Sequence, residues 1–88
     1  MPNPKSVDVS SQNGTITITK TGCANGEKLD AKVTLVGGAS ASLTGLAGPG
    51  GTATLTYAAM VNGTYSVEVT TYEGGVAGGP YGYTVTVP

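Results

Sequence analysis

The chain has 88 residues, four basic and five acidic side chains, and a net charge of −1. This length suits one domain with a small core. Histidine is absent and Cys23 is the only cysteine, so a zinc site is excluded, and the four cations are too few for a nucleic-acid surface. We therefore expect no metal, no cofactor and no nucleic-acid partner.

The composition favours β structure. Threonine and valine are abundant, the only aromatic residues are five tyrosines, and fifteen glycines and five prolines punctuate the chain. β-Branched residues and tyrosine suit a pleated, half-buried surface, whereas glycine and proline suit turns. We predict an all-β fold with no helix.

Apolar and polar residues alternate in short runs, which is the pattern of half-buried strands. Asn-Gly and Gly-Gly pairs separate the runs and predict tight turns. Six runs alternate clearly, and a seventh, between Leu43 and Leu46, predicts a short edge strand or an irregular crossing. In chain order, the clear runs are 7–9, 14–19, 32–35 (or 32–36), 53–57, 64–70 and 81–87.

The chain divides into an extended N-terminal arm, 1–6, and a single domain, 7–88. We expect Pro2 and Pro4 to keep the arm extended and to prevent it from forming a helix. No long apolar run follows Met1, so we expect no signal peptide and no membrane span. Because one cysteine cannot form an intrachain disulfide, we expect synthesis in a reducing compartment. The initial Met1 and the last strand-like run, which stops at Pro88, lead us to expect a complete, free-standing domain, with a fragment excised from a longer protein as the alternative.

The run Gly63-Thr64-Tyr65-Ser66-Val67 resembles the start of strand F in immunoglobulin-like domains. The resemblance implies an antiparallel β-sandwich of about seven strands, with Tyr65 forming the structural tyrosine corner. The antibody-type disulfide and the strand C tryptophan are both missing. The chain is therefore similar to the bacterial and bacteriophage modules that often lack them.

The sequence offers little for catalysis. General acid–base chemistry most often uses histidine, and a serine or cysteine nucleophile needs an adjacent base. Glu27 and Asp30 are close in sequence, but Lys28 lies between them, and we expect a solvated turn rather than a calcium site. We predict that the protein is not an enzyme.

Three surfaces are candidates for contact with a partner. The first is the predicted loop 72–81, with Tyr72 and Tyr81 at its base and Val76 near its tip. The alternative for this segment is a glycine-rich hairpin tip whose tyrosines pack on the sheet edge. The second is the arm carrying Pro2 and Pro4. The third is the small-residue stretch 37–51, where we expect Leu43 and Leu46 to be buried in the domain's own core.

A small uncharged module of this kind is similar to the decoration, or cement, proteins of tailed-bacteriophage heads. That resemblance implies a structural protein on the virion surface, made in the host cytoplasm, which binds the major capsid protein and can associate as a homotrimer. Two other interpretations stay open. One is a recognition module of a tail fibre, adhesin or secreted enzyme, with carbohydrate as its ligand, and the other is a spacer domain of a larger surface protein.

Overall fold

The computed structural model describes residues 6–88, so Pro2 and Pro4 lie outside the described part of the chain. The described residues form seven strands and no helix, and hence no helix that could span a membrane. The strands are β1 (Val7–Gln12), β2 (Thr15–Lys20), β3 (Lys28–Leu35), β4 (Ser40–Leu46), β5 (Ala53–Ala58), β6 (Gly63–Glu73) and β7 (Val76–Val87).

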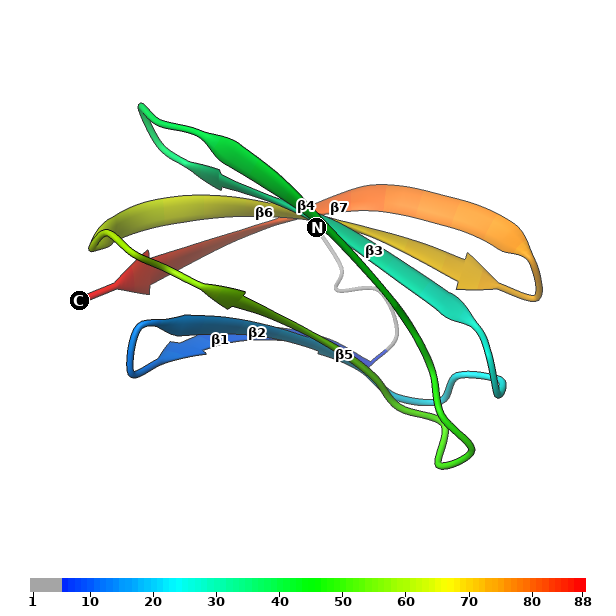
Figure 1. Cartoon of the computed structure of the whole chain (residues 1–88). Helices are drawn as coiled ribbons and strands as arrows, with labels where there is room; N and C mark the ends of the chain where they lie inside the picture. Colours follow the sequence, from blue (N-terminus) through cyan, green and yellow to red (C-terminus); the bar gives the residue numbers. More distant parts are fainter. Residues whose placement is uncertain (1–5) are drawn as a thin grey trace.

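The strands form two antiparallel sheets that pack face to face (Figure 1). One sheet has the order β1-β2-β5 and the other the order β4-β3-β6-β7. This is the strand arrangement of an immunoglobulin-like sandwich in which the fourth strand pairs with β3 instead of β5. The predicted all-β sandwich of about seven strands is confirmed.

The core lies between the sheets and follows from the alternation along each strand. In β2, Ile16 and Ile18 point inward and are fully buried, while the intervening threonines face outward. In β6, the alternate residues Tyr65, Val67 and Val69 are buried in the same way. The remaining buried apolar side chains are Val7, Leu29, Ala31, Val33, Ala47, Ala53, Leu55 and Val87.

The prediction that residues 72–81 form a loop is wrong. Its residues extend β6 and β7 into a long hairpin, in which Glu73 pairs with Val76 and only Gly74 and Gly75 form the turn. Both glycines have positive φ angles, 61° and 79°, which match a tight two-residue connection. The glycines and proline of β7 hide the alternation in the sequence, and pairing with β6 supplies the backbone hydrogen bonds that make this segment a strand.

Two other strands are longer than predicted. β1 continues to Gln12 and β3 begins at Lys28. Both extensions consist of residues that pair in register with a neighbouring strand, such as Lys28 with Leu46. The weak seventh run is a full strand, β4, at the edge of the four-stranded sheet.

Candidate functional site

The two ends of the sandwich differ in chemistry. We call the end that carries the Asn13–Gly14 turn and the loops 36–39 and 59–62 the uncharged end, because none of these connections contains a charged residue. The opposite end, with the connection 21–27 and the Gly74–Gly75 turn, is the charged end. Along the strands of the four-stranded sheet, the charged residues that come nearest to the uncharged end are Lys32 and Glu68, which lie opposite each other in β3 and β6.

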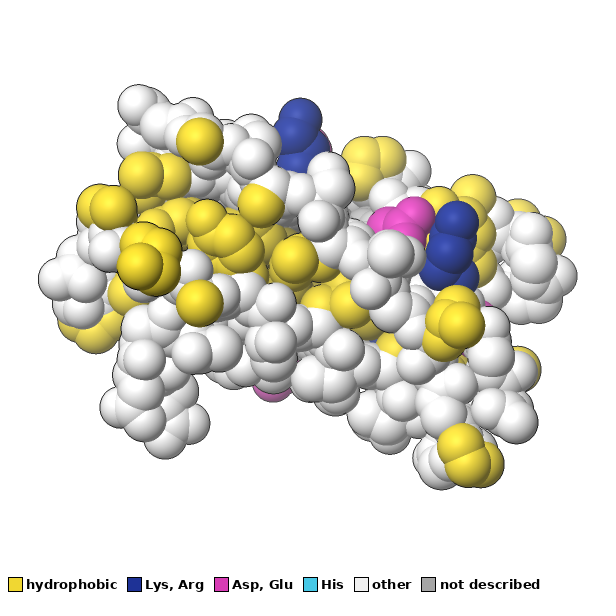
Figure 2. Space-filling view, viewed as in Figure 1, with side chains coloured by type: hydrophobic (Ala, Val, Ile, Leu, Met, Phe, Trp, Pro, Cys, Tyr) yellow, Lys and Arg dark blue, Asp and Glu magenta, His cyan; other side chains and the backbone are white. Residues whose placement is uncertain are grey.

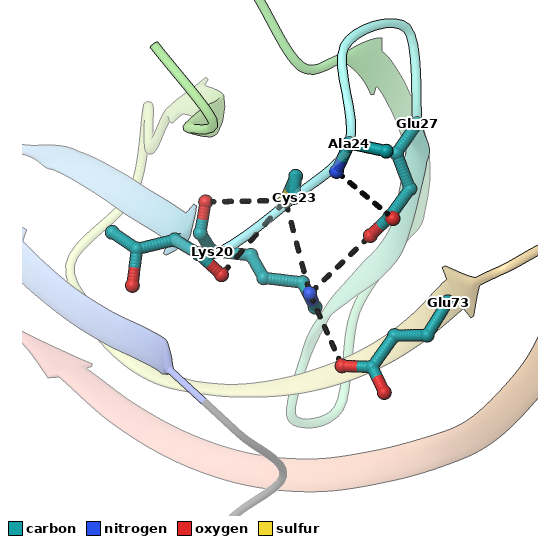
Figure 3. A network of polar contacts seen from close by, with 6 residues as sticks. Lys20, Cys23, Ala24, Glu27 and Glu73 are labelled. Carbon is teal, nitrogen blue, oxygen red and sulfur yellow. Dashed lines mark hydrogen bonds and ion pairs between the residues drawn. The ribbon is translucent and has the colours of Figure 1, made fainter.

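At the charged end, Lys20 is the centre of a buried polar network (Figure 3). Lys20 continues the inward series of Ile16 and Ile18, and only 1% of it is exposed. Its Nζ lies 3.3 Å from Oε2 of Glu27 and 3.2 Å from Oε2 of Glu73. A buried ammonium is costly unless it is paired, and these two carboxylates pair it.

The network favours the charged forms of Lys20 and Glu27. Burial alone would lower the pKa of Lys20, but hydrogen bonds from Lys20 to Glu73 and Glu27 outweigh burial and raise the pKa above its ordinary value of 10.5. A hydrogen bond from the Ala24 backbone N–H, 3.2 Å from Oε1, is the main cause that lowers the pKa of Glu27. Lys20 lowers it further, against the effect of burial.

The expectation of a solvated turn at Glu27 is wrong. The Glu27 side chain is 8% exposed and points to Lys20 instead of to Asp30. The sequence-based interpretation failed because the partners of Glu27 come from β2 and from the Ala24 backbone. Glu27 and Asp30 do not converge, and no group of three or more potential metal-ligating side chains occurs within residues 6–88.

Asp30 belongs to a second polar cluster, on the outer face of the four-stranded sheet. The Thr44 hydroxyl donates a hydrogen bond of 2.6 Å to Oδ1, and the Tyr72 hydroxyl donates one of 2.8 Å to Oδ2. The hydrogen bond from Thr44 is the largest cause that lowers the pKa of Asp30, and the bond from Tyr72 lowers it further, against the effect of partial burial. The same contact with Asp30 raises the pKa of Tyr72. Lys28 Nζ lies over the Tyr72 ring, 4.6 Å from its centroid.

The structure does not bring the predicted contact residues of the hairpin to one surface. Tyr72 lies on the outer face of the sheet and is held by Asp30. Tyr81 pairs with the inward-facing Val69 and is half-buried. Val76 is 71% exposed beside the hairpin turn. Of the described candidates, Val76 alone presents a large apolar surface to solvent.

A second apolar surface, which the sequence analysis missed, lies at the uncharged end. Met60 is 89% exposed, Val36 66% and Val61 55%. Figure 2 shows hydrophobic side chains gathered at this end of the visible face, while the charged side chains visible there lie farther along the molecule. The sequence signal was the pair Met60-Val61 directly before the Asn62-Gly63 turn, because apolar side chains next to a turn have little core to enter.

Hydrogen bonds hold the loops of the uncharged end together. The Tyr65 hydroxyl donates to the Val61 carbonyl oxygen at 2.5 Å, which is the contact of a tyrosine corner. The Val36 N–H donates to the Thr64 carbonyl at 3.0 Å, and the Ala59 N–H donates to the Gly14 carbonyl at 2.7 Å. The exposed side chains therefore stand on backbone that is fixed at several points.

The expected burial of both leucines in β4 is half wrong. Leu43 is partly buried against the core, but Leu46 faces solvent and is 67% exposed. Leu46 pairs with Lys28 on the outer side of the sheet, so strand alternation places it away from the core.

Comparisons with protein-family models, curated proteins and solved structures find no match to this chain.

Proposed function

We propose that this protein is a non-enzymatic docking protein that binds the surface of an assembled protein lattice through its uncharged end. The lattice that we propose is the head of a tailed bacteriophage, which the protein would decorate and brace. The observation that carries the proposal is the exposed apolar group Val36, Met60 and Val61, at an end whose connections contain no charged residue.

The physical argument rests on desolvation. Burying an exposed Val or Met side chain contributes about 1.5–3 kcal/mol, and the connections at this end carry no charged side chain that would have to be stripped of water. Methionine is also enriched in protein–protein interfaces. Because the loops are tied by backbone hydrogen bonds, little conformational entropy is lost when they dock.

Decoration would act by linkage. A protein that binds the assembled lattice and not its dissociated subunits stabilises the lattice in proportion to the logarithm of its free concentration. Repetition over many equivalent sites allows each contact to be modest. The half-exposed charged side chains nearer the opposite end, Lys28 and Glu73, would stay in water, which favours attachment by one end.

The carbohydrate-binding alternative has less support. Sugar-binding sites use exposed aromatic faces, and Tyr72 is the tyrosine nearest to such a role. Its ring lies under the Lys28 ammonium, and its hydroxyl is engaged by Asp30. Both contacts would have to be exchanged for contacts with the sugar.

The test adds purified protein to expanded phage heads that lack it and measures co-sedimentation and the melting temperature of the heads. We expect saturable binding and a higher melting temperature. Met60→Asp should abolish both effects, since it places a carboxylate in the docking surface. Val76→Asp is the matched control, because Val76 is also apolar and largely exposed but lies at the charged end.

The pair of variants separates the two candidate surfaces. If Val76→Asp abolishes binding and Met60→Asp does not, the hairpin tip is the docking surface instead. No binding by the unaltered protein would refute lattice decoration. Both side chains are exposed, so circular dichroism and thermal melting should show both variants folded.

A further inference from the structure

Three Asn-Gly pairs occur in the described chain, at Asn13, Asn25 and Asn62, and all three asparagines are exposed. Asn-Gly is the dipeptide most prone to spontaneous deamidation, because glycine leaves its backbone nitrogen unhindered. That nitrogen must attack the asparagine side chain, so a pair reacts only where the glycine N–H is not held by another group. The three pairs differ in this respect.

Two of the pairs have an engaged glycine nitrogen. The Gly26 N–H donates to the Ala47 carbonyl at 2.8 Å, which fixes the nitrogen that would attack Asn25. Gly63 pairs with Val87 in the β6–β7 ladder. Its neighbour Thr64 directs its carbonyl to Val36 on the other side of β6, so alternation turns the Gly63 N–H toward β7.

The Asn13-Gly14 pair is different. It forms the two-residue turn between β1 and β2, with positive φ angles of 53° and 75°. In such a turn the N–H of the second residue points away from the strands. Within residues 6–88, the Gly14 N–H has no hydrogen-bond partner, although the Gly14 carbonyl accepts from Ala59. We propose that Asn13 is a spontaneous deamidation site of the folded protein and that Asn25 and Asn62 are protected.

The chemistry needs only water. The Gly14 nitrogen attacks Cγ of Asn13, a C–N bond forms, the Cγ–Nδ2 bond breaks, and ammonia leaves with the proton from the Gly14 nitrogen. Water then opens the resulting succinimide at either carbonyl, giving aspartate or isoaspartate. The net change is the gain of one water and the loss of one ammonia, with no oxidation or reduction.

The product would alter the uncharged end. Deamidation places a carboxylate on the turn that hydrogen-bonds the loop bearing Met60, where the connections carry no charge. If the proposed docking function holds, this carboxylate should weaken binding, so that aged protein docks less well than fresh protein. That consequence rests on the proposed function, whereas the deamidation itself does not.

The test incubates the full chain in mildly alkaline buffer and follows the three sites by peptide mapping and mass spectrometry. Parallel samples in strong denaturant give the intrinsic rate of each site, and dividing the folded rate by this value isolates the effect of structure. We expect this ratio to be at least about tenfold higher at Asn13 than at Asn25 or Asn62, since their glycine nitrogens react only after local opening.

Equal ratios at the three sites, or a higher ratio at Asn25 or Asn62, would overturn the proposal. Asn13→Gln serves as the control for mass assignment, because glutamine reacts far more slowly. A second arm compares the docking of Asn13→Asp with that of unaltered protein. Loss of docking supports the consequence for function, and unchanged docking overturns that consequence while leaving the mass-spectrometric result standing.

Discussion

Lys20 Nζ and Glu73 Oε2 lie 3.2 Å apart, and this ion pair joins the two sheets of the sandwich. Lys20 ends β2 in the three-stranded sheet, and Glu73 ends β6 in the four-stranded sheet. No disulfide can link the sheets, since Cys23 is the only cysteine. Polar contacts therefore complete the core at the end where the apolar side chains stop.

Replacing Lys20 by methionine should lower the free energy of unfolding by about 2–4 kcal/mol, because Glu27 would remain buried without its cation. Glu73→Gln should cost less than about 1 kcal/mol, since half of the Glu73 side chain is in water. Lys32→Met, on the exposed face of β3, is the matched control and should be nearly neutral. Urea denaturation measures all three, and equal losses for Lys20→Met and Lys32→Met would contradict the role of the network.

The network also predicts how stability depends on pH. The folded pKa of Glu27 is lowered, so its stabilisation is complete above the ordinary value of 4.5 and is lost as the pH falls through the lower folded value. The folded pKa of Lys20 is raised, so its stabilisation is complete below 10.5 and is lost as the pH rises through the higher folded value. Thermal melting across the pH range should decline at both limits, and Glu27→Gln should flatten the acid limb. An unchanged acid limb in that variant would assign acid unfolding to other carboxylates, such as Asp30.

Tyr65→Phe tests the tyrosine corner. The change removes one hydroxyl and leaves the ring in the core, so we expect a loss of about 0.5–1.5 kcal/mol from the missing bond to Val61. Tyr57→Phe is the control, because the Tyr57 ring packs edge-on against Tyr65 with centroids 6.2 Å apart. If both variants unfold at the same urea concentration, the bond to Val61 contributes nothing to stability. Increased proteolysis in the loop 59–62 of Tyr65→Phe alone would show that this bond also holds the uncharged end.

The strands were predictable because alternation is a local signal. Thr15 to Thr19 shows both faces of β2 within one short run, and the same pattern extended by one residue puts Lys20 on the buried face. What sequence reasoning lacked was the partner of Lys20. Glu73 is brought to it by the face-to-face packing of the two sheets, and no local pattern encodes that packing.

The apolar surface at the uncharged end was missed for a related reason. Val36 and the pair Met60-Val61 are far apart in sequence and lie at the same end because β3 and β6 are neighbours, with the Val36 N–H bonded to the Thr64 carbonyl. Each alone looks like an ordinary exposed side chain. The hairpin 72–81 was misjudged because Gly78, Gly79 and Pro80 suppress the strand signal, although they lie within a paired strand.

That hairpin supplies the last prediction. Gly79 has φ +102°, and a Cβ there would lie 2.7 Å from the Val69 carbonyl oxygen. It faces the register shift between Val69 and Thr71, where the β7 backbone approaches β6 closely. Gly79→Ala should therefore lower the free energy of unfolding by about 1–3 kcal/mol, because both the backbone angle and the close contact oppose a side chain at this position. Gly82→Ala is the matched control in the same strand, since nothing lies within 4 Å of its added Cβ, and it should be neutral or slightly stabilising. Urea unfolding measures the stability of the two variants. Equal stability of Gly79→Ala and Gly82→Ala would mean that β7 does not approach β6 in this way.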